Sequence, residues 1–499
     1  MIDHVPVLLI VLPIVAGALP LLAGLVSDRA GWPIAVLAMV GQTGLAGWLG
    51  YAVATEGTIS YEVGGFAAPF GIELVADGLS AAVAALIAVV ALGVLGYVRT
   101  AGPREDSFFS LYLLLVAGLT GMTVTGDVFN LYVFLEITGL AAYALVASGR
   151  RASAAVAALK YLIVGTVGAS LYLLGVGYLL AATGTLNMAD LAAKLPEVGY
   201  DSTLVLTAFA LIVGGLAVKV ALFPVHTWQP GAYATAPDSV SALISALVST
   251  VAAYALARIL FSVFTVEFLR AVPVAQTALT VVAAVSVVAG SVLAVSQTDV
   301  QRMLAYSSVS QFGLVVAGFA VATPAAVVGA LVHLVGHAVM KGGLFAATGV
   351  VRRRTGATTI RGYDGLSARA PVAAGSFAVL ALAMVGVPPA VGFVGKWYIV
   401  LGAIRGGAWG LVVVLLASTL LTLAYFARMV ERMYFTAPPD PADEEDTAAL
   451  ADGGDPTDAP VSPGMVAVVV AAALVAVALG PTVPIIEGAI DATIQTLLQ

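Results

Sequence analysis

The sequence alternates between long apolar runs and short segments rich in Gly, Pro and charged residues. A bilayer-spanning helix takes about 20 apolar residues, and about fourteen of the runs are long and apolar enough to be such helices. The pattern therefore predicts an all-α integral membrane protein with about fourteen transmembrane helices. We place them near residues 5–26, 32–54, 79–97, 109–124, 129–147, 159–181, 203–222, 240–264, 274–295, 305–322, 325–351, 371–401, 410–433 and 461–485.

Basic residues gather at every second connection between these predicted helices. Fourteen of the 21 Lys and Arg residues lie in connections that follow an odd-numbered helix, whereas the alternate connections are mainly acidic. Positively charged loops stay on the cytoplasmic side of a membrane. We therefore expect a multi-pass protein of the cell membrane with both termini outside. The acidic segment 440–458 is expected to be a cytoplasmic loop.

Composition excludes several classes of protein. Hydrophobic residues make up 61% of the 499 residues, charged residues only 10%, and the mean hydropathy is +1.05. A soluble domain carries about 25% charged residues. Intrinsic disorder and nucleic-acid binding are excluded by the same figures. The chain has no Cys, which excludes disulfides, iron–sulfur clusters and Cys-ligated metals.

Several ionisable residues fall inside the apolar runs, among them one Glu, three Lys and two His, and a charge there costs about 2.5–3.5 kcal/mol on insertion scales. Such residues usually mark an ion pathway. The alternative is that they reach a helix end or form a structural buried pair. The sequence predicts a proton pathway made of Glu136, Lys219, His333, His337, Lys341 and Lys396.

His333, His337 and Lys341 recur at every fourth residue, which places them on one face of a helix. At 1.5 Å per residue the row is about 12 Å long. His titrates near neutral pH and a desolvated Lys releases its proton more readily, so the row suits proton transfer. The two His also resemble half of a zinc site, but the sequence offers no third ligand nearby, and we predict no metal.

Two of the lysines lie beside prolines that interrupt a helix. Lys219 precedes Pro224 by five residues, and Lys396 follows Pro388-Pro389. Pro removes a backbone donor, and the freed carbonyls must face protein or water at membrane depth. Paired broken helices in two halves of a chain are typical of an inverted repeat with a polar site at each break.

The order of these motifs resembles the antiporter-like subunits shared by Mrp-type Na⁺/H⁺ antiporters and respiratory complex I. Within this family the chain resembles the D-type subunits of the Mrp complexes most. The ordered set is specific, although no single piece is. It comprises residues 130–146, Lys160-Tyr161 with Gly165, residues 218–228, Ala236-Pro237, Asp299 with Arg302, residues 333–345 and residues 386–396.

The resemblance implies two inverted five-helix repeats with helices 7 and 12 broken. It divides the chain into N-terminal helices (1–105), a first repeat (106–265), a second repeat (266–436), the acidic loop (437–460) and a last helix (461–499). It implies that Glu136 and Lys219 form the paired site of the first half. His333, His337 and Lys341 would connect that site to Lys396. Supporting positions are His226, Thr250, Lys160, Asp299, Pro224, Pro388 and Pro389.

The chain departs from the family pattern at Thr250, where helix 8 usually carries a Lys. A hydroxyl can order water but holds no charge at neutral pH. The departure leaves open whether the path crosses the gap through water or is interrupted there.

The resemblance implies a proton-conducting subunit of a multisubunit cation/proton antiporter, with H⁺ and Na⁺ as transported ions and other membrane subunits as partners. The alternative is a proton-pumping subunit of complex I or of a related membrane-bound hydrogenase. A third interpretation is a carrier of organic solutes. The subunit itself is expected to bind no cofactor, because Cys and Gly-rich phosphate loops are absent.

Overall fold

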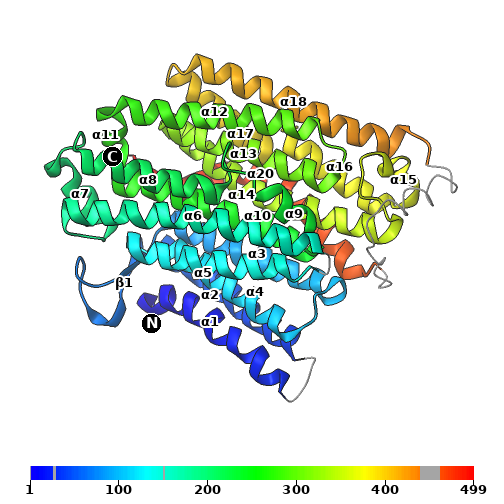
Figure 1. The fold of residues 1–499 in the computed structure, drawn as a ribbon, viewed down its shortest axis with the longest axis horizontal. Coiled ribbons are helices and arrows are strands. Elements are labelled where there is room, and N and C mark those ends of the chain that lie inside the picture. Colours follow the sequence, from blue (N-terminus) through cyan, green and yellow to red (C-terminus); the bar gives the residue numbers. More distant parts are fainter. Residues whose placement is uncertain (1, 26–29, 150–151, 439–460, 499) are drawn as a thin grey trace.

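The computed structural model describes residues 2–25, 30–149, 152–438 and 461–498. Nearly all of its helices run along one common axis (Figure 1). The elements are α1 (Val5–Gly24), α2 (Gly31–Glu56), β1 (Ile59–Glu62), β2 (Glu73–Ala76), α3 (Gly78–Ala101), α4 (Asp106–Val124), α5 (Val128–Ala147), α6 (Ala152–Thr183), α7 (Met188–Val198), α8 (Thr203–Val220), α9 (Gln229–Thr235), α10 (Asp238–Arg258), a π-helix (Ile259–Phe264), α11 (Thr265–Ala271), α12 (Pro273–Val295), α13 (Val300–Val321), α14 (Pro324–Thr355), α15 (Leu366–Arg369), α16 (Pro371–Val385), α17 (Val391–Arg405), α18 (Trp409–Phe435) and α20 (Pro463–Leu497).

Thirteen helices in the described ranges are long and apolar enough to cross a membrane. The predicted crossing at 371–401, helix 12, consists of two shorter helices, α16 and α17, with residues 386–390 between them. The prediction of an all-α integral membrane protein with broken helices 7 and 12 is confirmed. The acidic segment 440–458 lies outside the described residues.

Both breaks begin with a residue in the left-handed conformation. Ala221 follows α8 with φ 68°, and Gly386 follows α16 with φ 101°. Pro224 and Pro388 come two or three residues later and have no N–H to continue a helix. The sequence therefore ends each helix at the break and leaves backbone groups without helical partners there.

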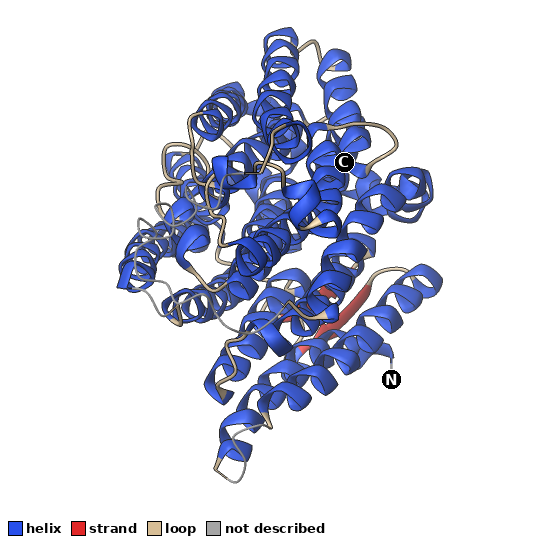
Figure 2. Ribbon diagram, turned by 90° about the vertical axis from the view of Figure 1, so that its right-hand side faces the viewer, coloured by secondary structure: helices blue, strands red, loops and turns tan. Residues whose placement is uncertain are grey.

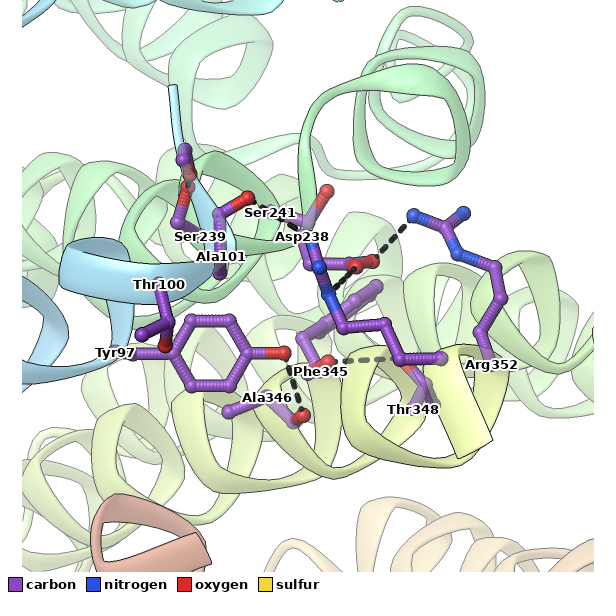
Figure 3. A network of polar contacts seen from close by, with 12 residues as sticks. Tyr97, Thr100, Ala101, Asp238, Ser239, Ser241, Phe345, Ala346, Thr348 and Arg352 are labelled. Atoms are coloured by element: carbon purple, nitrogen blue, oxygen red, sulfur yellow. Dashed lines mark hydrogen bonds and ion pairs between the residues drawn. The ribbon is translucent and has the colours of Figure 1, made fainter. Parts of the chain in front are cut away.

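Helix α10 lies at the centre of the bundle, and every residue from Asp238 to Ala257 is buried. A helix that is apolar all round must be covered on every side. At its first residue, Asp238 forms a 2.7 Å ion pair with Arg352 of α14. Beside it, the Tyr97 hydroxyl of α3 donates to the Ala346 carbonyl (Figure 3). These contacts fasten α3, α10 and α14 together at one end of the bundle.

The opposite end of α10 is fastened by Arg258. Its guanidinium lies 2.5 Å from Asp77, which caps α3, and also donates to Ser80 and Tyr254. Burial raises the pKa of the Asp77 carboxyl, but the positive charge and hydrogen bond of Arg258 outweigh it and leave the pKa below its usual range. Asp77 therefore stays charged at neutral pH and keeps the pair intact.

A short hairpin covers the end of the bundle near the N-terminal helices (Figure 2). Strands β1 and β2 pair antiparallel from Ile59 opposite Ala76 to Glu62 opposite Glu73. The His4 ring packs edge-on against Tyr61 of this hairpin, so α1 starts at this end. Helix α20 ends there as well (Figure 1). The side that faces the cytoplasm stays a prediction.

The two halves repeat the same backbone landmarks at a constant spacing of 172 residues (299 minus 127). Asp127 caps α5 and pairs in an isolated bridge with Asn187. Asp299 caps α13 and pairs in the same way with Thr359. Helices α6 and α14 begin and end with the same spacing, at 152–183 and 324–355. The repeat is therefore visible in the backbone.

The equivalent landmarks lie at opposite ends of the bundle. Thr125, beside Asp127, bridges to Leu74 just before α3 begins. In contrast, Asp299 bridges to Thr359 just after α14 ends, and Arg353 at that end of α14 donates to the Ala101 carbonyl at the end of α3. This arrangement is that of an inverted repeat. The boundaries that we assign to the two repeats stay predictions.

Candidate proton-transfer site

The first half of the site lies where α5 meets the end of α8. Lys219 occupies the last turn of α8, directly before the break, and its Nζ lies 3.3 Å from Glu136 Oε1. The ammonium also donates to the Tyr143 hydroxyl at 3.1 Å. The Lys219 side chain is only 8% exposed and that of Glu136 is 24% exposed. The structure thus places these two predicted residues together as a largely buried ion pair.

The break beside Lys219 leaves backbone carbonyls without helical hydrogen-bond partners, and side chains donate hydrogen bonds to them. The Trp228 indole N–H donates to the Val218 carbonyl at 2.9 Å. The Ser249 hydroxyl of α10 reaches the Lys219 carbonyl at 3.4 Å. His226 lies within the break, buried, with its ring stacked on Phe223. These contacts keep the non-helical segment inside protein, as membrane depth requires.

The second half of the site is the row on α14. His333, His337 and Lys341 are all fully buried. His333 Nε2 lies 2.9 Å from the Gln311 amide oxygen of α13. Lys341 donates to the Leu304 carbonyl at 2.6 Å and to a neighbouring hydroxyl. The rings of His333 and His337 are 6.5 Å apart, so the predicted row on one face is present.

Lys396 lies one turn into α17, just beyond the second break. Its Nζ donates to the carbonyls of Met384 and Val385 at 2.8 and 3.1 Å, which the end of α16 leaves free. The next residue toward the break, Gly395, packs so tightly on α14 that an added Cβ would lie 2.7 Å from the Cβ of His333. Lys396 therefore stands beside the His333 end of the row.

Helix α10 separates the two halves, and it carries Thr250. Ala246 and Ala242 lie against Gly342 of α14, and Asp238 lies against Gly349. The two helices therefore run antiparallel. Thr250 lies one turn beyond Ala246 on α10, at about the level of His337 on α14. Neither ring nitrogen of His337, nor the Thr250 hydroxyl, has a hydrogen-bond partner within the described part of the chain.

Two supporting residues lie apart from this row. Lys160 is exposed on α6. Asp299 caps α13 at an end of the bundle, where it accepts from the Arg302 N–H at 2.7 Å. Burial raises the pKa of the Asp299 carboxyl above its usual range, although this hydrogen bond opposes the shift. Asp299 therefore stabilises the start of α13, and none of its described contacts reaches the row.

Several partners of the row were not predicted from the sequence. Tyr143 follows Glu136 by seven residues, which places both on one face of α5. Gln311 follows Ser307 by four residues on α13, and both touch the row, at His333 and Lys341. In both cases the helical spacing was a usable signal. In the described residues, no group of three or more His, Asp or Glu is placed to hold a metal ion.

Comparisons with known proteins show the family to which the chain belongs. The family described as NADH:quinone oxidoreductase/Mrp antiporter, TM matches residues 125–422. The N subunit of NADH-quinone oxidoreductase from Desulforudis audaxviator is 46% identical over 88% of each chain. The D-type subunit of the Na⁺/H⁺ antiporter from Bacillus subtilis is 34% identical over 76% of each chain. A chain of the archaeal membrane-bound sulfane sulfur reductase, a respiratory membrane complex, is 31% identical, with a TM-score of 0.89 over 99% of this chain and 98% of that one.

Proposed function

Because the chain belongs to the NADH:quinone oxidoreductase/Mrp antiporter transmembrane family, we propose that it is the proton-conducting membrane subunit of a multisubunit Na⁺/H⁺ antiporter. One observation carries the proposal. Buried ionisable side chains lie at both broken helices and form the row on α14 between them. Burying an ionisable side chain in a membrane interior is unfavourable, and such residues typically mark a path for ions.

In the first half, the distance between Glu136 and Lys219 controls proton occupancy. A carboxylate beside a buried lysine favours its charged form, whereas a buried lysine alone tends to release its proton. Closing the pair loads the lysine, and opening it releases the proton toward the centre of the bundle. The membrane potential supplies about 2.3 kcal/mol per charge per 100 mV for such a cycle.

In the second half, the proton passes along α14 between Lys341 and His333 and reaches Lys396. Imidazole can accept a proton on one ring nitrogen and release one from the other. His337 of α14 and Thr250 of α10 lie at about the same level, and their polar side-chain atoms have no hydrogen-bond partner among the described residues, which supports a link between the halves at this level. Water is the group that satisfies buried polar atoms of this kind.

The partners in this proposal are other membrane subunits of the same assembly. The relatives that the chain matches are themselves named as subunits, one of an antiporter and one of an oxidoreductase. The proposed location is the cell membrane, and the proposed ions are H⁺ and Na⁺. Apolar side chains exposed on α6 and α18 provide faces for those partners or for lipid.

A second candidate is a proton-pumping subunit of a complex I-like oxidoreductase. The 46% identity to the N subunit of NADH-quinone oxidoreductase favours it. The same buried row serves both candidates, and they differ in the driving reaction. An antiporter couples H⁺ to a cation gradient, whereas the oxidoreductase couples H⁺ to electron transfer in other subunits.

The test uses membrane vesicles from cells that express the chain together with the subunits encoded beside it. A pH gradient is set up, NaCl is added, and the loss of the gradient is followed with a pH-sensitive dye. We expect Na⁺-dependent loss that disappears in the Lys396→Met variant. If the vesicles show none but acidify during quinone reduction, the second candidate replaces the first. Exchange that persists without this chain would contradict the proposal.

A further inference from the structure

The Lys219 ammonium has a second oxygen partner besides Glu136. The Tyr143 hydroxyl, from the same face of α5, lies 3.1 Å from Lys219 Nζ. A carboxylate offers only acceptor oxygens, so it pairs with the ammonium form of the lysine and gives no hydrogen bond to a neutral amine. A hydroxyl can accept from the ammonium and donate to the neutral amine. Tyr143 is therefore able to hold Lys219 in both states of its proton cycle.

Two glycines provide the space for this contact. At Gly165 of α6, an added Cβ would overlap the Tyr143 hydroxyl. At Gly139 of α5, an added Cβ would lie 2.9 Å from the hydroxyl and 3.2 Å from Lys219 Nζ. Both distances are shorter than normal carbon contacts, so a side chain at either position would move the pair apart.

An aromatic stack fixes the Tyr143 ring. Tyr161 meets it edge-on at 4.5 Å and lies flat on Trp228 at 3.9 Å, with 2° between the ring planes. Trp228 in turn donates to the Val218 carbonyl, next to Lys219. Tyr143 and Lys219 are thus tied to one rigid unit that includes the break after α8.

The inverted repeat relates the position of the Tyr143 hydroxyl to a residue in the second half. With the constant spacing of 172 residues (299 minus 127), Tyr161 and Gly165 of α6 correspond to His333 and His337 of α14. Where α14 carries a histidine side chain, α6 has a glycine, and the Tyr143 hydroxyl lies over it. The first half thus places a hydroxyl from α5 over the α6 position that corresponds to His337 of α14.

We infer that Tyr143 is the positioning residue of the first half of the pathway, holding Lys219 within reach of Glu136 in both protonation states, with its hydroxyl over the α6 position that corresponds to His337 of the second half. This inference rests on the proposed proton conduction. It assigns the hydroxyl, and the space left by Gly165, as parts of the site.

The test is the pH profile of proton-coupled exchange in the Tyr143→Phe variant, measured in the vesicles described above. The phenyl ring keeps the packing and loses only the hydroxyl. Hydrogen bonds to charged groups are stronger than those to neutral ones, so the midpoint of the profile should move by roughly one pH unit toward lower pH. The matched control is Tyr172→Phe, which removes a buried α6 hydroxyl bonded to the Val128 carbonyl and should leave the profile in place.

Gly165→Ala provides the second variant, because its methyl group displaces the hydroxyl while Tyr143 remains. It should shift the profile in the same direction, and the double variant should shift no further than Tyr143→Phe alone. An unchanged profile in Tyr143→Phe would overturn the inference. Because wild-type exchange and Lys396→Met are measured in the same vesicles, that result is distinguishable from a failure of the proposed function.

Discussion

Replacing Glu136 with Gln removes one charge from the Glu136–Lys219 pair and keeps the shape of the side chain. At 3.3 Å, and with an effective dielectric constant of about 20, Coulomb's law gives about 5 kcal/mol for the pair. The amide of Gln still accepts a hydrogen bond, which returns about 1–2 kcal/mol of that amount. The net loss is therefore about 3 kcal/mol, and each 1.4 kcal/mol is roughly a factor of ten.

Proton-coupled exchange in Glu136→Gln should accordingly fall by roughly a hundredfold. The assay is the dye measurement of Na⁺-dependent loss of a pH gradient in vesicles, normalised to the amount of assembled complex. Glu267→Gln, which neutralises an exposed carboxylate on α11, is the matched control and should retain wild-type exchange. Glu136→Asp keeps the charge and should retain part of the activity. Wild-type exchange in Glu136→Gln would refute the idea that this carboxylate controls the lysine.

Two further predictions concern the contacts that hold the site together. Gly395→Ala places a methyl group 2.7 Å from the Cβ of His333, so it should lower the stability by about 1–3 kcal/mol and depress exchange; an unchanged thermal midpoint in detergent would contradict this close packing. Asp238→Asn leaves Arg352 without its buried ionic partner and should cost about 3 kcal/mol of unfolding free energy. A thermal melt equal to that of the wild type would show that this pair does not fasten α10 to α14.

Much of the fold follows from local sequence signals. The apolar runs predict the crossings because length and hydropathy suffice for a membrane helix. Pro224 and Pro388 predict the breaks because each removes a backbone donor within an apolar run. The run at 371–401 was predicted as a crossing with a break at Pro388-Pro389, and the structure adds where its two parts end and begin, at Val385 and Val391.

The site was predictable at the level of its titratable residues. Ionisable residues inside apolar runs are recognisable because their insertion into a membrane is unfavourable. The i, i+4 spacing places His333, His337 and Lys341 on one helix face. Their neutral partners are harder to predict, since many Tyr, Ser and Gln residues lie in apolar helices. The correspondence between Tyr143 and His337 depends on the three-dimensional repeat. The residue types do not reveal this correspondence, because position 165 is Gly and position 337 is His.

We propose that the buried row conducts protons, and Lys341 is its most enclosed lysine, with no exposed surface. The direct measurement is proton-coupled exchange in vesicles that contain the Lys341→Met variant, which keeps the length of the side chain and removes the proton-carrying group. We expect exchange to fall by roughly tenfold or more, with assembly of the complex and its thermal stability retained. Exchange at the wild-type rate in correctly assembled Lys341→Met complexes would contradict it.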